Sequence, residues 1–108
     1  MSRIVSAFVA GLLTVAAAGA VHAQENVTFR IGVMNWQGNA AQAPVEITNT
    51  TSAPIRPTEL GCDFVSVGRV VGSDRQRVPP LAPGQAVTVS VSSDTGGQLV
   101  DSIMCRLL

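Results

Sequence analysis

The sequence predicts an all-β protein: a small antiparallel sandwich of six or seven strands with one disulfide, preceded by a signal peptide. Three observations support this prediction. After residue 23, apolar residues alternate with polar ones, residues typical of turns separate the alternating runs, and two cysteines, Cys62 and Cys105, lie inside such runs. A period of two places every second side chain on the same face of a strand, so that one face is buried and the other is solvated.

Six segments are the expected strands. They are 27–33, 45–47, 60–64, 69–71, 87–91 and 103–107. Most of them are rich in valine and isoleucine, and β-branched residues with a period of two are typical of strands. Short strands at this spacing, separated by polar turns, favour an immunoglobulin-like sandwich, with a small barrel as the alternative.

The connections between these segments carry turn-forming residues. Turns are expected at 35–39, 49–54, 67–68, 72–74, 82–85 and 94–97. The segment 82–85 reads Ala-Pro-Gly-Gln, which predicts a type II turn. Proline sets φ at the second position of such a turn, and glycine accepts the positive φ at the third.

The first 23 residues have the layout of a secretory signal peptide. Arg3 supplies a short positive region, residues 4–21 are apolar, and Val21-His22-Ala23 predicts cleavage after Ala23. The alternative is an uncut membrane anchor, because the apolar run approaches the length that spans a bilayer. With cleavage, residues 24–108 form one immunoglobulin-like domain without a stable membrane anchor, located in the periplasm or secreted.

The mature domain has no excess of positive charge. The seven basic residues are all arginine, and loss of Arg3 leaves six against seven carboxylates, a net charge of −1. Nucleic acids and anionic membranes are bound by clustered positive charge, so we expect neither as a partner. The absence of lysine, together with abundant alanine, glycine and valine, indicates a bacterium with a GC-rich genome.

Cys62 and Cys105 are predicted to form a disulfide. An even number of cysteines in a small exported domain usually does so. Each cysteine has apolar residues two positions away on both sides, so both side chains should face the core, where facing strands can bring the sulfurs together. A catalytic thiolate needs a base, and the only histidine, His22, leaves with the signal peptide. A reducible or regulatory disulfide is the alternative.

The residues that usually carry catalysis are missing from the mature domain. It contains no histidine, lysine or tyrosine, which excludes Ser-His-Asp triads and Schiff-base lysines. Carboxylates can act in pairs, but here they are scattered and are interpreted as solvated surface: Glu46, Glu59, Asp63, Asp74, Asp94 and Asp101. We therefore expect no enzyme, no cofactor and no metal site.

Two features are candidates for interaction. Trp36, the only tryptophan, lies in a polar segment and is interpreted as a plug over one end of the sandwich or as an interface anchor, with the plug favoured. Arg69, Arg75 and Arg77 are close in sequence. One interpretation is a strip that binds an anion or a carboxylate. The other, which is favoured, is a solvated sheet edge whose charges prevent pairing with another strand.

The run 44–107 resembles small exported bacterial domains of the FxLYD kind and their disulfide-bearing relatives. The matching stretches are PVEITNTTSAPI, LGCDFVSVGRVVG, LAPGQAVTVSV and DSIMCRLL. The Phe-x-Leu-Tyr-Asp signature itself is absent, and Cys62-Asp63-Phe64-Val65-Ser66 stands in its region. The resemblance implies an immunoglobulin-like sandwich that serves as an accessory module at the cell envelope.

The predicted function is therefore that of a non-catalytic, protein-binding accessory module of the bacterial cell envelope. Its expected partner is another envelope or secreted protein, and a sheet edge is one surface that such a domain can offer. The alternative is a small periplasmic inhibitor or chaperone-like protein that acts on secreted enzymes or fibre subunits.

Overall fold

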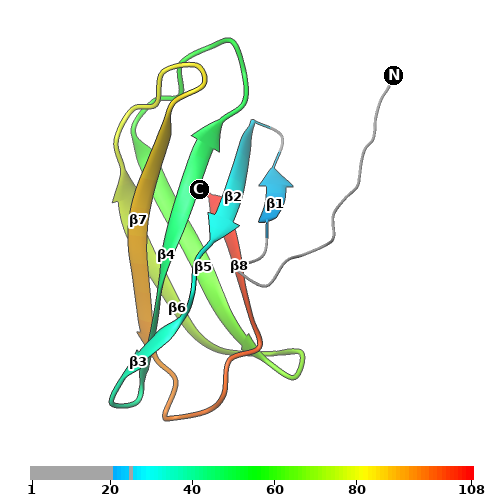
Figure 1. The fold of residues 1–108 in the computed structure, drawn as a ribbon, viewed down its shortest axis with the longest axis vertical. Helices are drawn as coiled ribbons and strands as arrows, with labels where there is room; N and C mark the ends of the chain where they lie inside the picture. Colours follow the sequence, from blue (N-terminus) through cyan, green and yellow to red (C-terminus); the bar gives the residue numbers. More distant parts are fainter. Residues whose placement is uncertain (1–20, 25) are drawn as a thin grey trace.

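The computed structural model describes residues 21–24 and 26–108, which form eight β-strands and no helix. The strands are β1 (Val21–Gln24), β2 (Val27–Ile31), β3 (Asn35–Gln37), β4 (Ala40–Asn49), β5 (Thr58–Ser66), β6 (Arg69–Val78), β7 (Ala86–Asp94) and β8 (Ser102–Leu107). They lie in two antiparallel sheets (Figure 1). The all-β prediction is confirmed, and β2 to β8 are the strands of the predicted domain.

The predicted signal peptide falls mostly outside this description. Residues 1–20 lie outside the described residues, whereas the last three, 21–23, belong to β1. Within the described part of the chain, nothing forms a helix that is long and apolar enough to cross a membrane.

The larger sheet is built around β4. β2 pairs with the second half of β4, from Val27↔Asn49 to Ile31↔Val45, and β3 pairs with its first half. β7 pairs with β4 residues that also pair with β2 and β3, so it lies along the opposite side of β4. β1 pairs with the outer side of β2. The smaller sheet has the order β6-β5-β8.

Side chains from both sheets form one hydrophobic core. It comprises Val27, Phe29, Ile31, Ala41, Ala43, Val45, Ile47, Leu60, Cys62, Phe64, Val78, Leu81, Val91, Val100, Ile103 and Cys105. In β2, β5 and β8 these are the residues that the alternating pattern assigns to the buried face. The period-two prediction is therefore confirmed for these three strands.

Two of the expected turns, 35–39 and 72–74, are mostly or wholly strand. Residues 72–74 lie inside β6, and at Gly72 the chain passes so close to β7 that an added Cβ atom would clash with the Ser93 hydroxyl. Glycine in a strand can mark such a close approach as well as a turn. In the segment 35–39, residues 35–37 form β3 and only Gly38 and Asn39 make the turn.

The turn predicted at 82–85 is confirmed. Gly84 has φ 77°, and the Gln85 N–H donates to the Ala82 carbonyl at 3.0 Å, as a type II turn requires. The hairpin turn predicted at 67–68 is also confirmed, since Val67 and Gly68 have φ of 49° and 78°. Positive φ at both central residues is the type I′ conformation, whose twist matches that of antiparallel strands.

Val67 is an unusual residue for this turn, which leads to a prediction about stability. A β-branched residue with positive φ is strained, typically by about 1–3 kcal/mol, and asparagine tolerates this conformation far better. We expect Val67→Asn to raise the free energy of unfolding by about 1 kcal/mol, because Val67 is 86% exposed and loses little packing. Urea denaturation of both proteins measures the difference, and an unchanged or lower stability would show that the turn is not strained at this residue.

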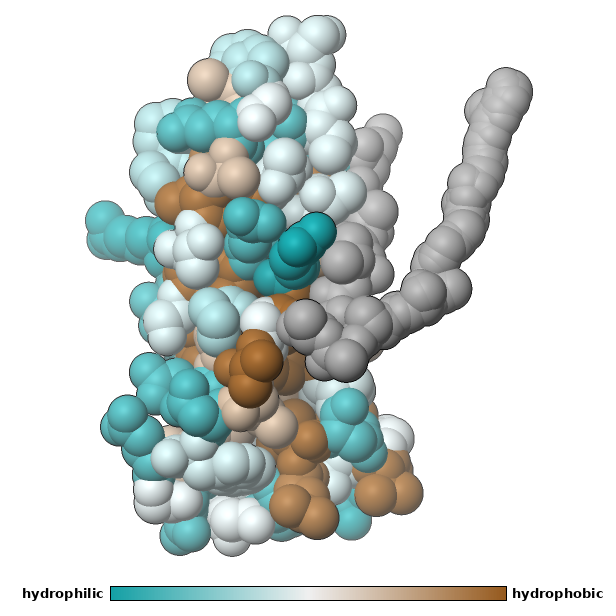
Figure 2. Space-filling model, viewed as in Figure 1, coloured by the Kyte–Doolittle hydropathy of each residue, from teal (hydrophilic) through white to brown (hydrophobic). Residues whose placement is uncertain are grey.

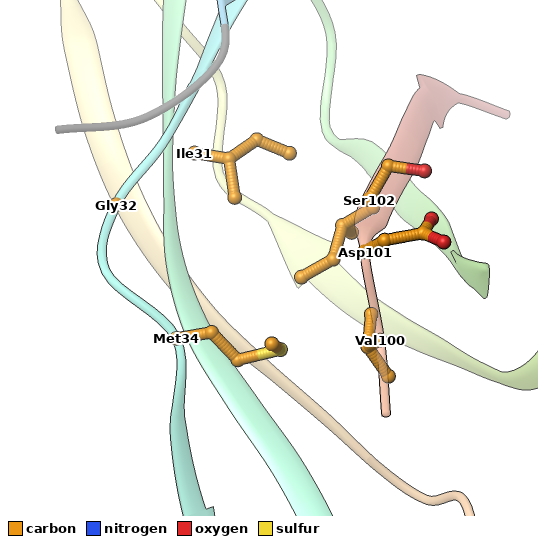
Figure 3. Close-up of a pocket in the computed structure, with 7 residues that line it drawn as sticks. Ile31, Gly32, Met34, Val100, Asp101 and Ser102 are labelled. Atoms are coloured by element: carbon orange, nitrogen blue, oxygen red, sulfur yellow. The ribbon is translucent and has the colours of Figure 1, made fainter. Parts of the chain in front are cut away.

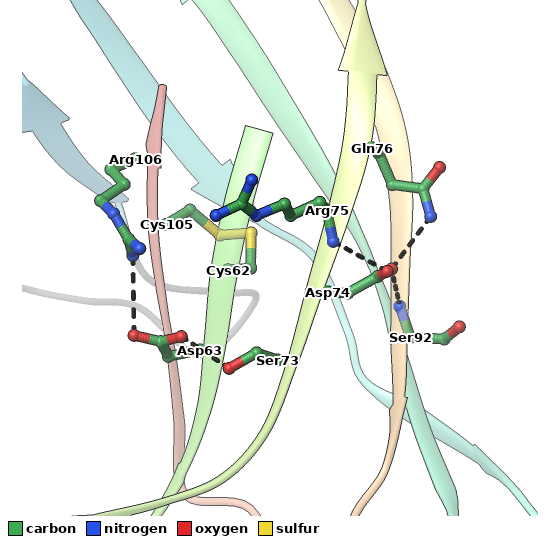
Figure 4. The surroundings of a disulfide bond; sticks show 9 residues. All are labelled: Cys62, Asp63, Ser73, Asp74, Arg75, Gln76, Ser92, Cys105 and Arg106. Carbon is green, nitrogen blue, oxygen red and sulfur yellow. Dashed lines mark hydrogen bonds and ion pairs between the residues drawn. A yellow bond between two sulfur atoms is a disulfide. The ribbon is translucent and has the colours of Figure 1, made fainter. Parts of the chain in front are cut away.

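The two sheets are joined directly along one side. There the Ser92 N–H of β7 donates to Asp74 Oδ2 of β6 at 2.9 Å (Figure 4). On the other side of the molecule, β8 is the edge of the smaller sheet, and β2 with β1 forms the edge of the larger one. The fold is therefore a sandwich in which one pair of edges is linked by a side chain.

Candidate interaction surface

The predicted disulfide between Cys62 and Cys105 is present (Figure 4). The two residues are direct partners on β5 and β8, with 4.1 Å between their Cα atoms, and both are buried. The bridge therefore joins neighbours within one sheet rather than strands that face each other. A disulfide in so small a domain is compatible with an oxidising, exported location.

The carboxylates hold strands and turns together. Asp63 accepts a hydrogen bond from Ser73 at 2.8 Å and lies 3.6 Å from Arg106, so it connects all three strands of the smaller sheet. Asp74 accepts from Gln76 and from the Ser92 N–H (Figure 4). Three of the others make similar contacts: Glu46 with Arg30, Glu59 with Arg75, and Asp94 with the Gly96 N–H.

The three arginines of the expected strip do not converge on one point. Arg75 and Arg77 are exposed on β6 and share one face of the strand. Arg75 lies 3.6 Å from Glu59, so its charge is already paired. Arg69 begins β6, and six residues of extended chain place it about 20 Å from Arg75. This arrangement favours the solvated edge over an anion-binding strip.

Trp36 lies on β3, paired with Ala41 of β4, and is 38% exposed. Directly paired residues share a face of the sheet, and the Ala41 side chain is fully buried. Trp36 therefore lies on the inner face at this end of the sandwich, which agrees with the plug interpretation, and only part of its ring is exposed. Trp36 remains a candidate for an interface anchor, since a partly exposed tryptophan has a large apolar surface to offer a partner.

Further apolar side chains are exposed at the same end of the sandwich. Figure 1 places β3, the β5–β6 turn and the segment between β7 and β8 at this end, which is the lower one in that view. The exposed apolar side chains here are Trp36 on β3, Val67 in the β5–β6 turn, Val70 near the start of β6 and Leu99 between β7 and β8, and we call them the apolar loop end. Val67 and Leu99 are 86% and 80% exposed. Figure 2 shows apolar surface in the lower part of the same view.

Hydrogen bonds hold these loops in place. The segment 95–101 is attached to the β3–β4 turn by the Thr95 N–H, which donates to the Asn39 carbonyl at 3.1 Å. At its other end the Asp101 N–H donates to the Val65 carbonyl, and Asp101 Oδ2 accepts from the Val67 N–H at 2.7 Å. The apolar loop end is thus preorganised, which lowers the entropic cost of binding a partner.

The sequence alone does not predict that Val67, Val70 and Leu99 belong to an interaction surface. Val70 and Leu99 look like ordinary strand or loop residues in the sequence, and only the structure shows that they are exposed at the end of the sandwich that carries β3. Val67 is nevertheless unusual in the sequence, because valine is unfavourable at the positive φ that a two-residue hairpin turn requires. Such strain often accompanies function.

A cavity of about 180 Å³ lies next to this end, between β2–β3 and the start of β8 (Figure 3). It is lined by Ile31, Gly32, Met34, Val100, Asp101, Ser102 and Ile103. Most of these residues are apolar, so the cavity suits an apolar side chain. Among residues 21–24 and 26–108, no three His, Cys, Asp or Glu side chains are grouped as a metal site requires.

Comparisons with known proteins add nothing to these features: no family model matches this chain, and no curated protein or solved structure matches it. The resemblance to FxLYD-like domains stays a prediction.

Proposed function

We propose that the mature domain is a non-catalytic, protein-binding accessory module of the bacterial cell envelope, in the periplasm or secreted. The observation that carries this proposal is the apolar loop end. Exposed apolar side chains cost solvation and invite aggregation, so several of them at one end of a small domain favour an interaction site there. Here Val67 and Leu99 lie on loops that hydrogen bonds to Asn39 and Asp101 hold in place, and Trp36 and Val70 lie on the adjoining strands β3 and β6.

Two further observations support binding over catalysis. Loops at one end of a sandwich are the usual place for recognition in this architecture. The carboxylates that could serve an acid–base mechanism are engaged with arginines, side-chain amides and main-chain N–H groups. The partner is expected to be another envelope or secreted protein that offers a complementary apolar surface.

The test is cross-linking in the native periplasm, followed by mass spectrometry of the captured proteins. We expect one specific partner with the wild-type protein and a yield about tenfold or more lower with Trp36→Ala combined with Leu99→Ser, because truncating an interface anchor typically costs about 2 kcal/mol. Met104→Ser is the matched control, since Met104 is 55% exposed but lies on β8.

The possible outcomes test the proposed function and the proposed binding surface separately. Failure to recover any specific partner, in cells that express the protein naturally, would contradict the proposed function. A partner recovered at full yield by the double variant would contradict the apolar loop end as its binding surface. Equal loss with Met104→Ser would show that exposed apolar residues act non-specifically.

A further inference from the structure

Two hollows adjoin each other at the end of the sandwich opposite the apolar loop end, where β5 begins and β6 ends (Figure 1). Their volumes are about 520 and 300 Å³. Pro57 and Thr58 line both of them and so form the ridge between them. Each hollow has one arginine in its wall, Arg77 in the larger and Arg56 in the smaller. We call this pair of hollows the proline-ridge site.

Neither arginine has an anionic partner in the part of the chain that the structure describes. The ion pairs there join Arg30 with Glu46, Arg75 with Glu59, and Arg106 with Asp63. Glu59 also lines the larger hollow, but Arg75 lies 3.6 Å from it and offsets its charge. The site therefore presents two guanidinium groups whose charge no described carboxylate offsets. Guanidinium groups bind carboxylates through paired, charge-assisted hydrogen bonds.

The main chain around both arginines is held in place. Just before Arg56, Ile55 and Leu81 exchange two main-chain hydrogen bonds, of 2.8 and 3.0 Å. Just after it, the ring of Pro57 fixes φ, and β5 begins at the next residue. Arg77 lies within the paired part of β6. A ligand that binds here has to order side chains but not the backbone, which lowers the entropic cost of binding.

Apolar side chains complete the walls of both hollows. Pro57 and Pro79 line the larger one, and Ile55 and Leu108 line the smaller one. Apolar groups of a ligand gain affinity by burial against these residues, so carboxylates alone would use only part of the site. The two volumes lie in the range of sites that bind ligands larger than a single ion, about 300–1,000 Å³. The site therefore suits a short chain that carries both carboxylates and apolar side chains.

We infer that the proline-ridge site binds an acidic peptide segment of another protein across Pro57. One carboxylate of the segment pairs with Arg56, a second pairs with Arg77, and apolar side chains between them occupy the hollows. The inference goes beyond the proposed function, because it assigns a second surface at the other end of the sandwich. It does not depend on whether the apolar loop end binds a partner.

The probes are capped synthetic peptides in which two glutamates are separated by one, two or three leucines. Isothermal titration calorimetry with the purified protein, at low ionic strength, measures their dissociation constants. We expect the spacing that matches the two arginines to bind best. Its counterpart with glutamine in place of both glutamates should bind about tenfold or more weakly, because it loses the charge-assisted hydrogen bonds. Added salt should weaken the acidic peptide and leave the glutamine peptide almost unchanged.

Arg56→Gln and Arg77→Gln test the two contacts separately. Each should weaken the best peptide by about tenfold. Both side chains are exposed, so the variants should fold, which circular dichroism verifies. Arg69→Gln is the matched control and should bind like the wild type, because Arg69 is an exposed arginine at the opposite end of β6. A peptide with only one glutamate should be weakened by one of the two variants and not by the other, since only one pair remains.

The inference is overturned if no acidic peptide binds more tightly than its glutamine counterpart, or if Arg69→Gln weakens binding as much as Arg56→Gln and Arg77→Gln do. Glutarate has two carboxylates but no apolar side chains, and it should bind about tenfold or more weakly than the best peptide. Equal affinity would overturn the peptide as the occupant and assign the site to small dicarboxylates.

One further variant keeps this inference separate from the proposed function. Trp36→Ala with Leu99→Ser should retain peptide binding, because both residues belong to the apolar loop end. Absence of peptide binding, with the cross-linked partner still captured, would refute this inference alone. Peptide binding without any cross-linked partner would contradict only the function proposed for the apolar loop end.

Discussion

Removing the disulfide, with Cys62→Ala and Cys105→Ala together, is expected to lower the free energy of unfolding by about 4 kcal/mol. The bridge joins residues 43 apart in sequence, so it restricts the unfolded chain strongly. Small domains typically have a total stability of about 5–15 kcal/mol. The double variant should therefore be marginally folded at 25 °C.

Urea denaturation followed by circular dichroism measures this loss. Wild-type protein in reductant is the matched control, because it lacks the bridge but keeps both sulfur atoms in the core. It should lose nearly as much stability as the variant. A difference below about 1 kcal/mol between oxidised and reduced protein would contradict the disulfide as a major stabilising feature.

Replacing Asn49 by leucine is the second change with a large expected effect, a loss of about 3 kcal/mol. Asn49 ends β4 and is fully buried. Its Nδ2 donates to the carbonyls of Ala53 and Leu81 at 2.8 and 3.1 Å. Its Oδ1 accepts from the Thr51 N–H and hydroxyl at 2.9 and 2.8 Å. Leucine has a similar volume but leaves these groups without partners.

Thermal and urea denaturation of Asn49→Leu measure the cost. Gln42→Leu is the control on the same strand, because the Gln42 amide lies at the surface and donates to Ser90 at a long 3.5 Å. We expect that control to change stability by less than about 0.5 kcal/mol. Equal effects of the two substitutions would show that the Asn49 network contributes no more than a surface contact.

The buried faces of β2, β5 and β8 could be predicted because each combines period two with large apolar residues. β4 was predicted too short. Its first half contains Ala41 and Ala43, which are buried but have no strong strand preference, and Pro44 interrupts the pattern. The missing N–H of Pro44 is tolerated because it falls opposite Gly32, just beyond the end of β2.

Some features of the candidate site could not be predicted from the sequence, because they depend on contacts between residues that are far apart in the chain. The sequence marks Trp36 as a candidate, but how far its side chain is exposed depends on the strand that it forms with β4. The role of Asn49 depends on a carbonyl 32 residues away, at Leu81. Asp74 was interpreted as solvated surface, and only the approach of β7 gives it the Ser92 N–H as a partner.

The Asp74–Ser92 hydrogen bond also determines how the molecule can fluctuate. It links the sheets along the β6–β7 side, whereas the β2 and β8 edges flank the cavity near Ile31 and Ile103. We therefore expect the two sheets to separate more readily along the β2–β8 side than along the β6–β7 side.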